Sequence, residues 1–230
     1  DSKLGNVNRQ IQRFAEGMKL PANERYWQWA TFRNEETVNY LLKESYEQKI
    51  HRLSDEAYSY KKRKEQILKS IGKIGNINNV LYTDMHLVLP NDMLFKVDHM
   101  SMANGLEVRT PFLDHNLVNF AFEIPTQFKI NQNIQKKIVQ DTFRNILPKR
   151  LYNRSKKGFE IPVTDWLKKD LNYLIVGELF SKDFVLEQGI FNWTAIEKQL
   201  KRLNSKDVGN SPGTLWNLMV FQRWYKKHMM

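Results

Sequence analysis

Apolar side chains recur at helical spacing through most of this chain, and proline stands between the recurring segments. The pattern is clearest over residues 35–53, 113–122, 134–147, 166–175 and 193–203. Because proline lacks an amide donor and opens or ends helices, its placement agrees with helix boundaries. Alternation with a period of two is scarce, and no β-branched run is bounded by Asn-Gly or Asp-Gly turns. The sequence therefore predicts a mainly α fold.

Several residues predict how these helices begin and pack. Pro90 is expected at the first position of a helix, and Asp114 is expected to cap the helix that follows it. Thr164 or Asp165 is expected to cap the helix around residue 166. The small residues near position 101 (Ser101, Ala103 and Gly105) are expected to allow close approach to a neighbour. Residues 215–225 predict a buried closing helix, and the Lys-rich and then Gly/Asn-rich stretch 60–75 a mobile connection or an exposed helix end.

Composition excludes several classes of site. The chain has 230 residues, enough for one large domain or two small ones, and no cysteine. It therefore has no disulfide framework, no Cys-ligated metal and no thiol nucleophile, and the five histidines show no paired metal spacing. No apolar run is long enough to span a membrane, and the first residues have no apolar signal segment. We expect no resident metal, no membrane partner and a cytoplasmic location.

The charge indicates an anionic partner without identifying it. Lys and Arg number 36 against 25 Asp and Glu, a formal net charge of +11. Such a balance suits a nucleic acid, a phosphate group or an acidic lipid surface, although charge alone favours an ordinary solvated Lys-rich surface. The common catalytic signatures are absent, because the sequence contains no GxGxxG, no Walker-type GxxxxGK[ST], no HExxH and no GxSxG.

Two segments carry unusual polar groups. In residues 90–115, Glu107 and Arg109 flank one apolar residue directly before Thr-Pro-Phe-Leu-Asp. They predict either an ion pair at a helix junction or a polar cluster that lines a cleft. Residues 149–162 hold five Lys or Arg before the first acid, together with Gly158. Such a loop can follow a polyphosphate, but from the residues alone a solvated basic loop is the better interpretation.

The two segments, in this order, resemble the C-terminal part of the synthetase domain of glutamine-hydrolysing asparagine synthetases. The resemblance covers about the whole chain and is strongest over residues 81–230, with residues 1–80 a weaker helical lead-in. It rests on residues 89–94 (Leu-Pro-Asn-Asp-Met-Leu), 98–103 (Asp-His-Met-Ser-Met-Ala), 107–114 (Glu-Val-Arg-Thr-Pro-Phe-Leu-Asp), 154–159 (Arg-Ser-Lys-Lys-Gly-Phe) and 166–167 (Trp-Leu). One departure is His99, where the family usually has arginine.

The resemblance implies the helical C-terminal portion of an adenine-nucleotide α-hydrolase-like (ATP-pyrophosphatase) synthetase domain whose parallel sheet is missing here. The family's glutaminase cysteine, its Ser-Gly-Gly-x-Asp-Ser loop and its magnesium-holding Gly-x-Asp-Glu segment do not occur in this sequence. We therefore expect a C-terminal fragment that binds neither ATP nor Mg²⁺ tightly by itself. Apolar surface left uncovered by the missing sheet is expected to favour self-association.

The resemblance also implies the reaction and the residues that serve it. In the family, ATP activates the side-chain carboxylate of aspartate, and ammonia derived from glutamine then forms the amide. Lys156 matches the catalytic lysine and is expected to bind pyrophosphate, with Arg154 beside it on the same loop. Glu107 is expected near the ammonia path or paired with Arg109, and Asp98 near the nucleotide.

Two other functions remain open at this point. One is a related amidotransferase that acts on a carboxylate other than that of aspartate. The other is a basic helical nucleic-acid-binding module, which would bind any duplex in a strongly salt-dependent way. The second is disfavoured because basic and aromatic residues do not alternate in any recognised module pattern, so no nucleic-acid partner is expected.

Overall fold

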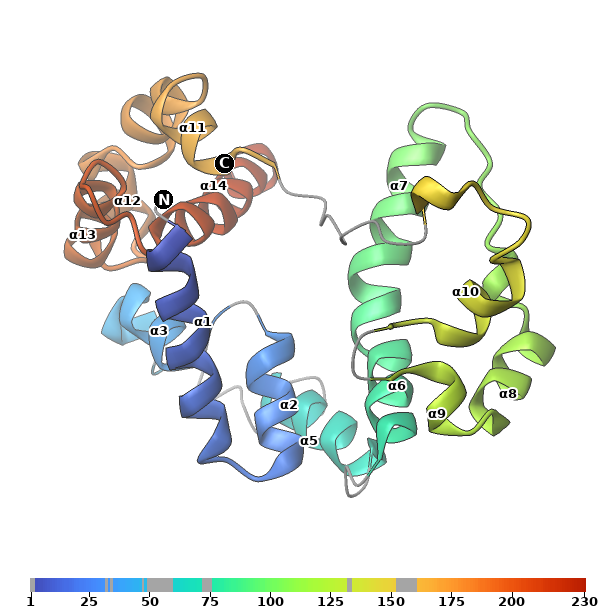
Figure 1. The fold of residues 1–230 in the computed structure, drawn as a ribbon. Coiled ribbons are helices and arrows are strands. Elements are labelled where there is room, and N and C mark those ends of the chain that lie inside the picture. Colours follow the sequence, from blue (N-terminus) through green and yellow to red (C-terminus); the bar gives the residue numbers. More distant parts are fainter. Residues whose placement is uncertain are drawn as a thin grey trace. The chain divides into compact units, whose positions relative to one another are not determined.

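The structure is a computed structural model, and it confirms a mainly α chain (Figure 1). The residues that it describes are 3–31, 33, 35–46, 48, 60–71, 76–131, 134–151 and 161–230. Over these ranges it contains helices and two isolated backbone bridges, and no strand. None of the helices in the same ranges has the length and hydropathy needed to cross a membrane. The chain divides into two compact units, residues 1–66 with 159–230 (unit 1) and residues 67–158 (unit 2).

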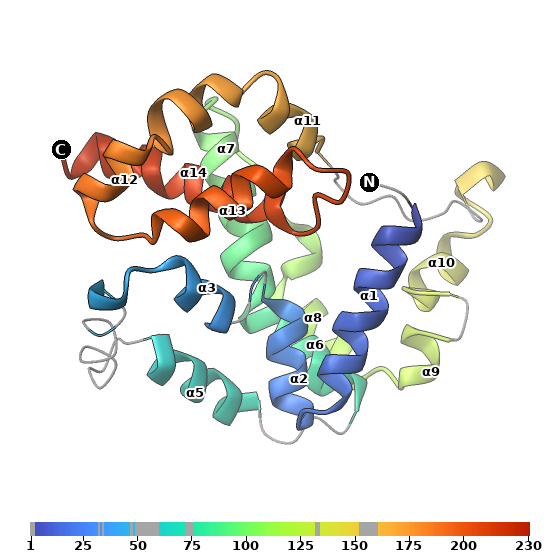
Figure 2. The ribbon, with the colours of Figure 1, turned by 90° about the vertical axis from the view of Figure 1, so that its left-hand side faces the viewer.

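Unit 1 combines the two ends of the chain. Its elements are α1 (Lys3–Met18), α2 (Ala22–Ala30), α3 (Glu35–Leu41), α11 (Val163–Lys168), the π-helix η4 (Leu174–Leu179), α12 (Lys182–Gln188), α13 (Trp193–Leu203) and α14 (Ser211–His228). Helix α5 (Tyr60–Ile71) runs from unit 1 into unit 2. Figure 2 shows α13 and α14 lying side by side, and α14 also contacts α11 and η4.

The apolar core of unit 1 gathers around α14. Leu167 of α11, Ile196 and Leu203 of α13 and Leu215 of α14 are fully buried. Ile196 and Leu203 lie seven residues apart, which places them on one face of α13. Burial of each such side chain stabilises the fold by about 1.5–3 kcal/mol, so this cluster is the main source of stability in unit 1.

The helix predicted over residues 35–53 stops early. Helix α3 ends at Leu41, and Leu42 forms an antiparallel bridge with Phe191, supported by hydrogen bonds from Lys43 N to Ile190 O and from Asn192 N to Leu41 O. The tertiary pairing thus interrupts the predicted helix at Leu42 and Lys43, and residues 44–46 are helical again. Residues 47 and 49–53 of the predicted helix lie outside the described residues.

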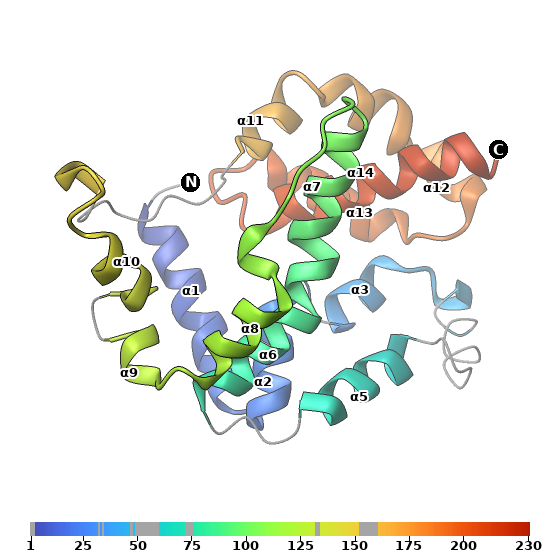
Figure 3. The same ribbon diagram turned by 90° about the vertical axis from the view of Figure 1, so that its right-hand side faces the viewer.

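Unit 2 is built on one long helical run. It contains α6 (Ile77–His86), the π-helix η1 (Leu89–Leu94), α7 (Phe95–Met102), the 3₁₀ turns η2 (Pro111–Leu113) and η3 (Lys149–Leu151), α8 (His115–Glu123), α9 (Thr126–Lys129) and α10 (Lys137–Phe143). Figure 3 shows α6 and α7 following one another along this run. Pro90 lies in the first turn of η1, as expected for its position. Proline has no amide hydrogen, and its ring clashes with the carbonyl four residues before it, so the turn widens to π geometry. The Asn91 side chain donates a hydrogen bond to Leu87 O at 2.7 Å.

Of the two helix caps predicted from the sequence, one is found in the structure and one is not. Asp114 caps α8 as predicted, since its carboxylate accepts from the amides of Asn116 and Leu117. The predicted Thr164 or Asp165 cap is wrong, because α11 begins at Val163 behind Pro162 and has no side-chain cap. Pro162 itself occupies the cap position, with φ of −78° and ψ of 56°, so the helix starts upstream of both residues.

Two other sequence-based expectations need correction. Gly105 makes no close approach, because a Cβ built there would meet no atom within 4 Å. Its φ of +65° shows that it serves a left-handed turn instead. The closing helix α14 is present but buries only one face, since Val220 and Trp224 are about half exposed.

Candidate functional site

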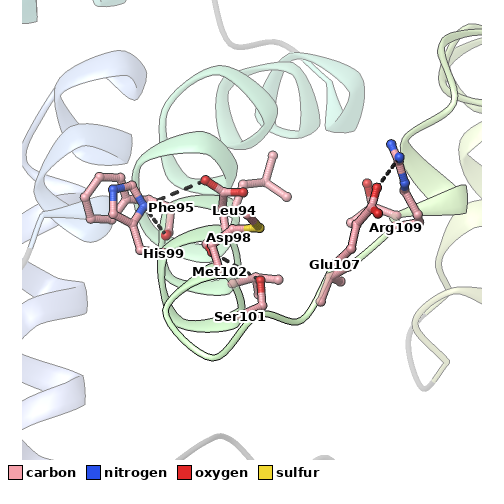
Figure 4. Close-up of a pocket in the computed structure, with 12 residues that line it drawn as sticks. Leu94, Phe95, Asp98, His99, Ser101, Met102, Glu107 and Arg109 are labelled. Atoms are coloured by element: carbon pink, nitrogen blue, oxygen red, sulfur yellow. Dashed lines mark hydrogen bonds and ion pairs between the residues drawn. The ribbon is translucent and has the colours of Figure 1, made fainter.

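A pocket of about 820 Å³ lies in unit 2 between α7 and the extended segment 105–110 (Figure 4). Its geometry follows from the end of α7. The amide of Leu106 donates to Ser101 O at 2.9 Å, and that of Gly105 to Met102 O at 3.0 Å, which satisfies the last carbonyls of the helix. The chain then turns at Gly105, so the segment that follows supplies a second wall of the pocket.

Asp98 and His99 project from the α7 wall. The His99 Nδ1 lies 3.0 Å from Phe95 O, and its ring stacks on Phe95 with centroids 4.0 Å apart. When Nδ1 donates to this carbonyl, the Nε2 of a neutral ring is left as the acceptor. The Asp98 carboxylate lies 3.9 Å from Nδ1, and its side chain is 76% exposed. The helix thus fixes the histidine ring, while the carboxylate next to it stays open to solvent or a ligand.

Glu107 and Arg109 form the opposite wall. Their side chains make an ion pair within the extended segment, as Figure 4 shows. Glu107 is 68% exposed and Arg109 86% exposed, so the pair joins no two helices. Exposed pairs of this kind contribute about 0–1 kcal/mol to stability, so the carboxylate and the guanidinium are available to a ligand at little cost to the fold.

The predicted site residues are only partly brought together. Asp98 and Glu107, nine positions apart in the sequence, line the same pocket. Lys156 and Arg154 lie outside the described residues. Among the described residues, the ion-pair partner of Asp98 is the adjacent His99. Ser101 lines the pocket as well, and its hydroxyl donates to Asp98 O at 3.1 Å.

Sequence reasoning missed two features of this pocket. His99 stands out in the sequence only as a departure from arginine. In the structure its ring contacts Phe95, one turn before it on α7, through both a hydrogen-bond-length contact to the carbonyl and ring stacking. Thr110 lines the pocket without having been singled out. Its position directly after Glu-x-Arg was the available signal, because Thr110 continues the segment that supplies this wall of the pocket.

Chemically, the pocket presents two carboxylates, an imidazole and a guanidinium to a small polar ligand. Among the described residues no group of three or more His, Asp or Glu side chains is arranged to hold a metal ion. No residue of this pocket is therefore assigned as a metal ligand.

Comparison with known proteins identifies the family. Residues 1–226 match the asparagine synthase family. The chain belongs to this family. The identification from the sequence with the C-terminal part of a synthetase domain is thereby confirmed, and the helical architecture fits that portion of an ATP-pyrophosphatase-type domain.

Individual asparagine synthetase relatives are distant and much longer. Asparagine synthetase [glutamine-hydrolyzing] 1 of Bacillus subtilis is 26% identical over 193 residues, which is 80% of this chain and 29% of the relative. Asparagine synthetase 3 of the same organism is 34% identical over 97 residues, 39% of this chain and 16% of the relative. A putative asparagine synthetase of Mycobacterium tuberculosis is 27% identical over 150 residues, 63% of this chain and 22% of the relative. The chain thus spans less than a third of these relatives, and no solved structure matches it significantly.

Proposed function

We propose that this chain serves the synthetase reaction of a glutamine-hydrolysing asparagine synthetase. In that reaction an oxygen of the aspartate side-chain carboxylate attacks the α-phosphorus of ATP. The bond to pyrophosphate breaks, and an acyl-adenylate forms. The lone pair of ammonia then attacks the acyl carbon, AMP leaves, and the nitrogen loses a proton. The observation that carries the proposal is that Asp98 and Glu107, from the two halves of the family motif, line one pocket.

Each site residue has a proposed role in these two steps. Lys156 donates hydrogen bonds to the departing pyrophosphate, and Arg154 holds the same anion or orients the loop. A preorganised cation stabilises the charge that develops there more than it stabilises bound ATP, and this difference accelerates the step. Glu107 orients the incoming ammonia when it is not paired with Arg109. Asp98 holds a basic group near the nucleotide.

The proposal also requires parts that this sequence does not contain. The phosphate-cradling glycine loop and its sheet, Mg²⁺ and the glutaminase domain that supplies ammonia are expected as partners within the synthetase. The names of the relatives, which specify glutamine hydrolysis, support this requirement. We propose that the 230 residues alone are inactive.

The test is Lys156→Ala in a synthetase polypeptide that contains these residues. Loss of one preorganised donor is expected to lower the rate of ATP–pyrophosphate exchange by about 10²–10³-fold. Lys182→Ala, which removes an exposed lysine of α12, is the matched control and should leave exchange unchanged. Normal exchange in the Lys156 variant would refute its catalytic role, and exchange by residues 1–230 alone would refute the requirement for further segments.

A further inference from the structure

A second hollow in unit 2 is almost wholly apolar. It measures about 640 Å³ and lies between α6, α8 and α10, with η2 at one side. We call it the apolar groove, and its main lining residues are Leu81, Met85, Leu117, Phe120, Val139 and Phe143. Phe120 is 57% exposed and Phe143 43% exposed. Aromatic and aliphatic surface of this kind is unfavourable in water, so the groove favours an apolar occupant.

Two charged residues line the groove, the carboxylate Asp84 and the cation Lys129. The Lys129 ammonium donates to Asn78 Oδ1 at 2.6 Å and to Phe122 O at 3.2 Å, and it lies 5.6 Å from the Phe122 ring centroid. Both acceptors are neutral, and no carboxylate among the described residues pairs with this lysine. Burial lowers the pKa of Lys129, as expected for an ammonium that lacks a counter-charge. An occupant that brings a carboxylate would supply this missing charge.

The extent of exposed apolar surface argues for a polypeptide occupant. Among the described residues of unit 2, only Leu68 and Thr83 are buried. Outside the groove, Ile146 is 73% exposed and Met100 64% exposed. A unit of this size normally needs a buried core to be stable, and a ligand that filled only the groove would leave most of this surface in water.

We propose that the apolar groove receives an apolar segment of the synthetase polypeptide, and that this segment carries an Asp or Glu whose carboxylate pairs with Lys129. The inference rests on the proposed function, because it takes the occupant from the same enzyme. The Bacillus subtilis relative has room for such a segment, since this chain matches only 29% of its length. The segment would give unit 2 the core that its own described residues do not form.

The test uses the full 230-residue chain and overlapping 15-residue synthetic peptides. The peptides cover the parts of Bacillus subtilis asparagine synthetase 1 that lie outside the matched region, and binding is measured by fluorescence anisotropy. We expect binding by a peptide that combines several apolar side chains with an Asp or Glu. Replacement of that acid by its amide should weaken binding about 10-fold or more, which is typical of a lost charged hydrogen bond.

Lys129→Met should weaken binding of the acidic peptide by a similar factor. The Lys129→Met variant should bind the amide peptide and the acidic peptide equally well, because the ion pair is already lost. Lys149→Met, which removes an exposed lysine of η3, is the control for net charge and should bind normally. Phe120→Asp should abolish binding by both peptides. Circular dichroism of each variant checks that the helices persist, and the Lys129 variant carries the test if the Phe120 variant does not fold.

Three outcomes would overturn the inference. The first is that no peptide binds, and the second is that binding ignores both Lys129 and Phe120. The third is that dodecanoate binds in a Lys129-dependent manner while no peptide competes, which would make the groove a small-molecule site. Loss of the synthetase assignment through Lys156 would leave the peptide result unchanged, so failure of the inference and failure of the proposed function are distinguishable.

Discussion

At the scale of single residues, the Glu107–Arg109 ion pair lines the pocket but contributes little to the stability of the fold. Glu107→Gln removes the charge of Glu107 and leaves Arg109 in water. Because both side chains are mostly exposed, the free energy of unfolding should change by less than about 0.5 kcal/mol. Urea denaturation of the 230-residue chain measures this change. A loss of more than about 1.5 kcal/mol would show that the pair is structural and would weaken the proposed role of Glu107 with ammonia.

In contrast to the Glu107–Arg109 pair, a hydrogen-bonded amide pair in unit 1 should contribute strongly to the free energy of unfolding. Gln188 and Gln222 exchange two hydrogen bonds, at 2.6 Å and 3.0 Å, and Gln222 is fully buried. Gln222→Ala leaves the Gln188 amide without its partner and opens a cavity, so it should destabilise the chain by about 2–3 kcal/mol.

Replacement of both glutamines by methionine tests the explanation for that loss. The two thioether side chains fill a similar volume and leave no unsatisfied amide, so the double variant should unfold within about 1 kcal/mol of the original chain. Thermal and urea unfolding of the single and double variants give the comparison. A double variant as unstable as Gln222→Ala would show that packing, and not hydrogen bonding, sets the cost.

Residue-level rules predicted those features that depend on a few neighbours. Asp114 could be assigned as a cap because the groups that it satisfies lie two and three positions away. That Asp98 and Glu107 line one pocket could not be predicted from their neighbours in the sequence, because it depends on the turn at Gly105 that brings their segments together. The contact of His99 with Phe95 lies within one turn of α7, so the spacing of four residues between them was the available signal.

At the scale of helices, one lysine connects three elements of unit 1. The Lys64 ammonium on α5 lies 3.1 Å from a carboxylate oxygen of Glu24 on α2 and 3.0 Å from one of Glu35 on α3. Desolvation by burial acts to lower the pKa of Lys64, but hydrogen bonds and charge from Glu35 and Glu24 outweigh it and raise the pKa above its ordinary value of 10.5. Lys64→Met should therefore destabilise the chain by about 1–2 kcal/mol near neutral pH.

The pH dependence of that difference has a defined sign. A lysine whose pKa is higher in the folded state contributes its full stability below the unfolded pKa, and it loses this contribution as the pH rises through the folded pKa. The stability gap between the original chain and Lys64→Met should thus shrink only above about pH 10.5. Lys69→Met on the same helix, an exposed position, is the control and should show no gap. A gap that is constant to pH 12 would rule out the charge as its cause.

Helix existence was more predictable than helix length. The apolar stripes predicted the regions of α3, α8, α10, α11, α13 and α14, because apolar periodicity reflects the one face that must be buried. No stripe was assigned over α1, α2, α6 or α12. The ends depend on contacts far away in the sequence, as when Leu42 pairs with Phe191 and stops α3. Likewise, the stripe over residues 166–175 is divided between α11 and the π-helix η4, because α11 ends at Lys168.

For the molecule as a whole, the two units should differ in local stability. The fully buried side chains of α13 and α14 belong to the core of unit 1, whereas α8 and α10 of unit 2 have no buried residue. Amides of α13 and α14 should therefore exchange with deuterium on the order of 100-fold more slowly than amides of α8 and α10. Exchange followed by mass spectrometry resolves the segments. Equal protection in both units would mean that unit 2 is stabilised by something other than a core.

The division of the chain could not be predicted from composition. The Lys-rich and then Gly/Asn-rich stretch 60–75 was predicted to be a mobile connection or an exposed helix end. The structure places α5 over residues 60–71, and residues 72–75 lie outside the described residues. The boundary between the units falls within that helix, between Gln66 and Ile67. A continuous helix carries no local signal of such a boundary, because the signal lies in which distant residues each half contacts.

The discontinuous makeup of unit 1 has a consequence for how the chain acquires its fold. Leu41 and Leu42 meet their partners near Phe191 only after about 150 intervening residues have been synthesised. At ribosomal speeds of about 5–20 residues per second, α1–α3 wait many seconds for the helices that complete their core. Closing so long a loop also costs entropy before any contact compensates for it, and such topologies fold slowly. Of the helices in this chain, α1–α3 are thus expected to stay incompletely packed for longest during synthesis.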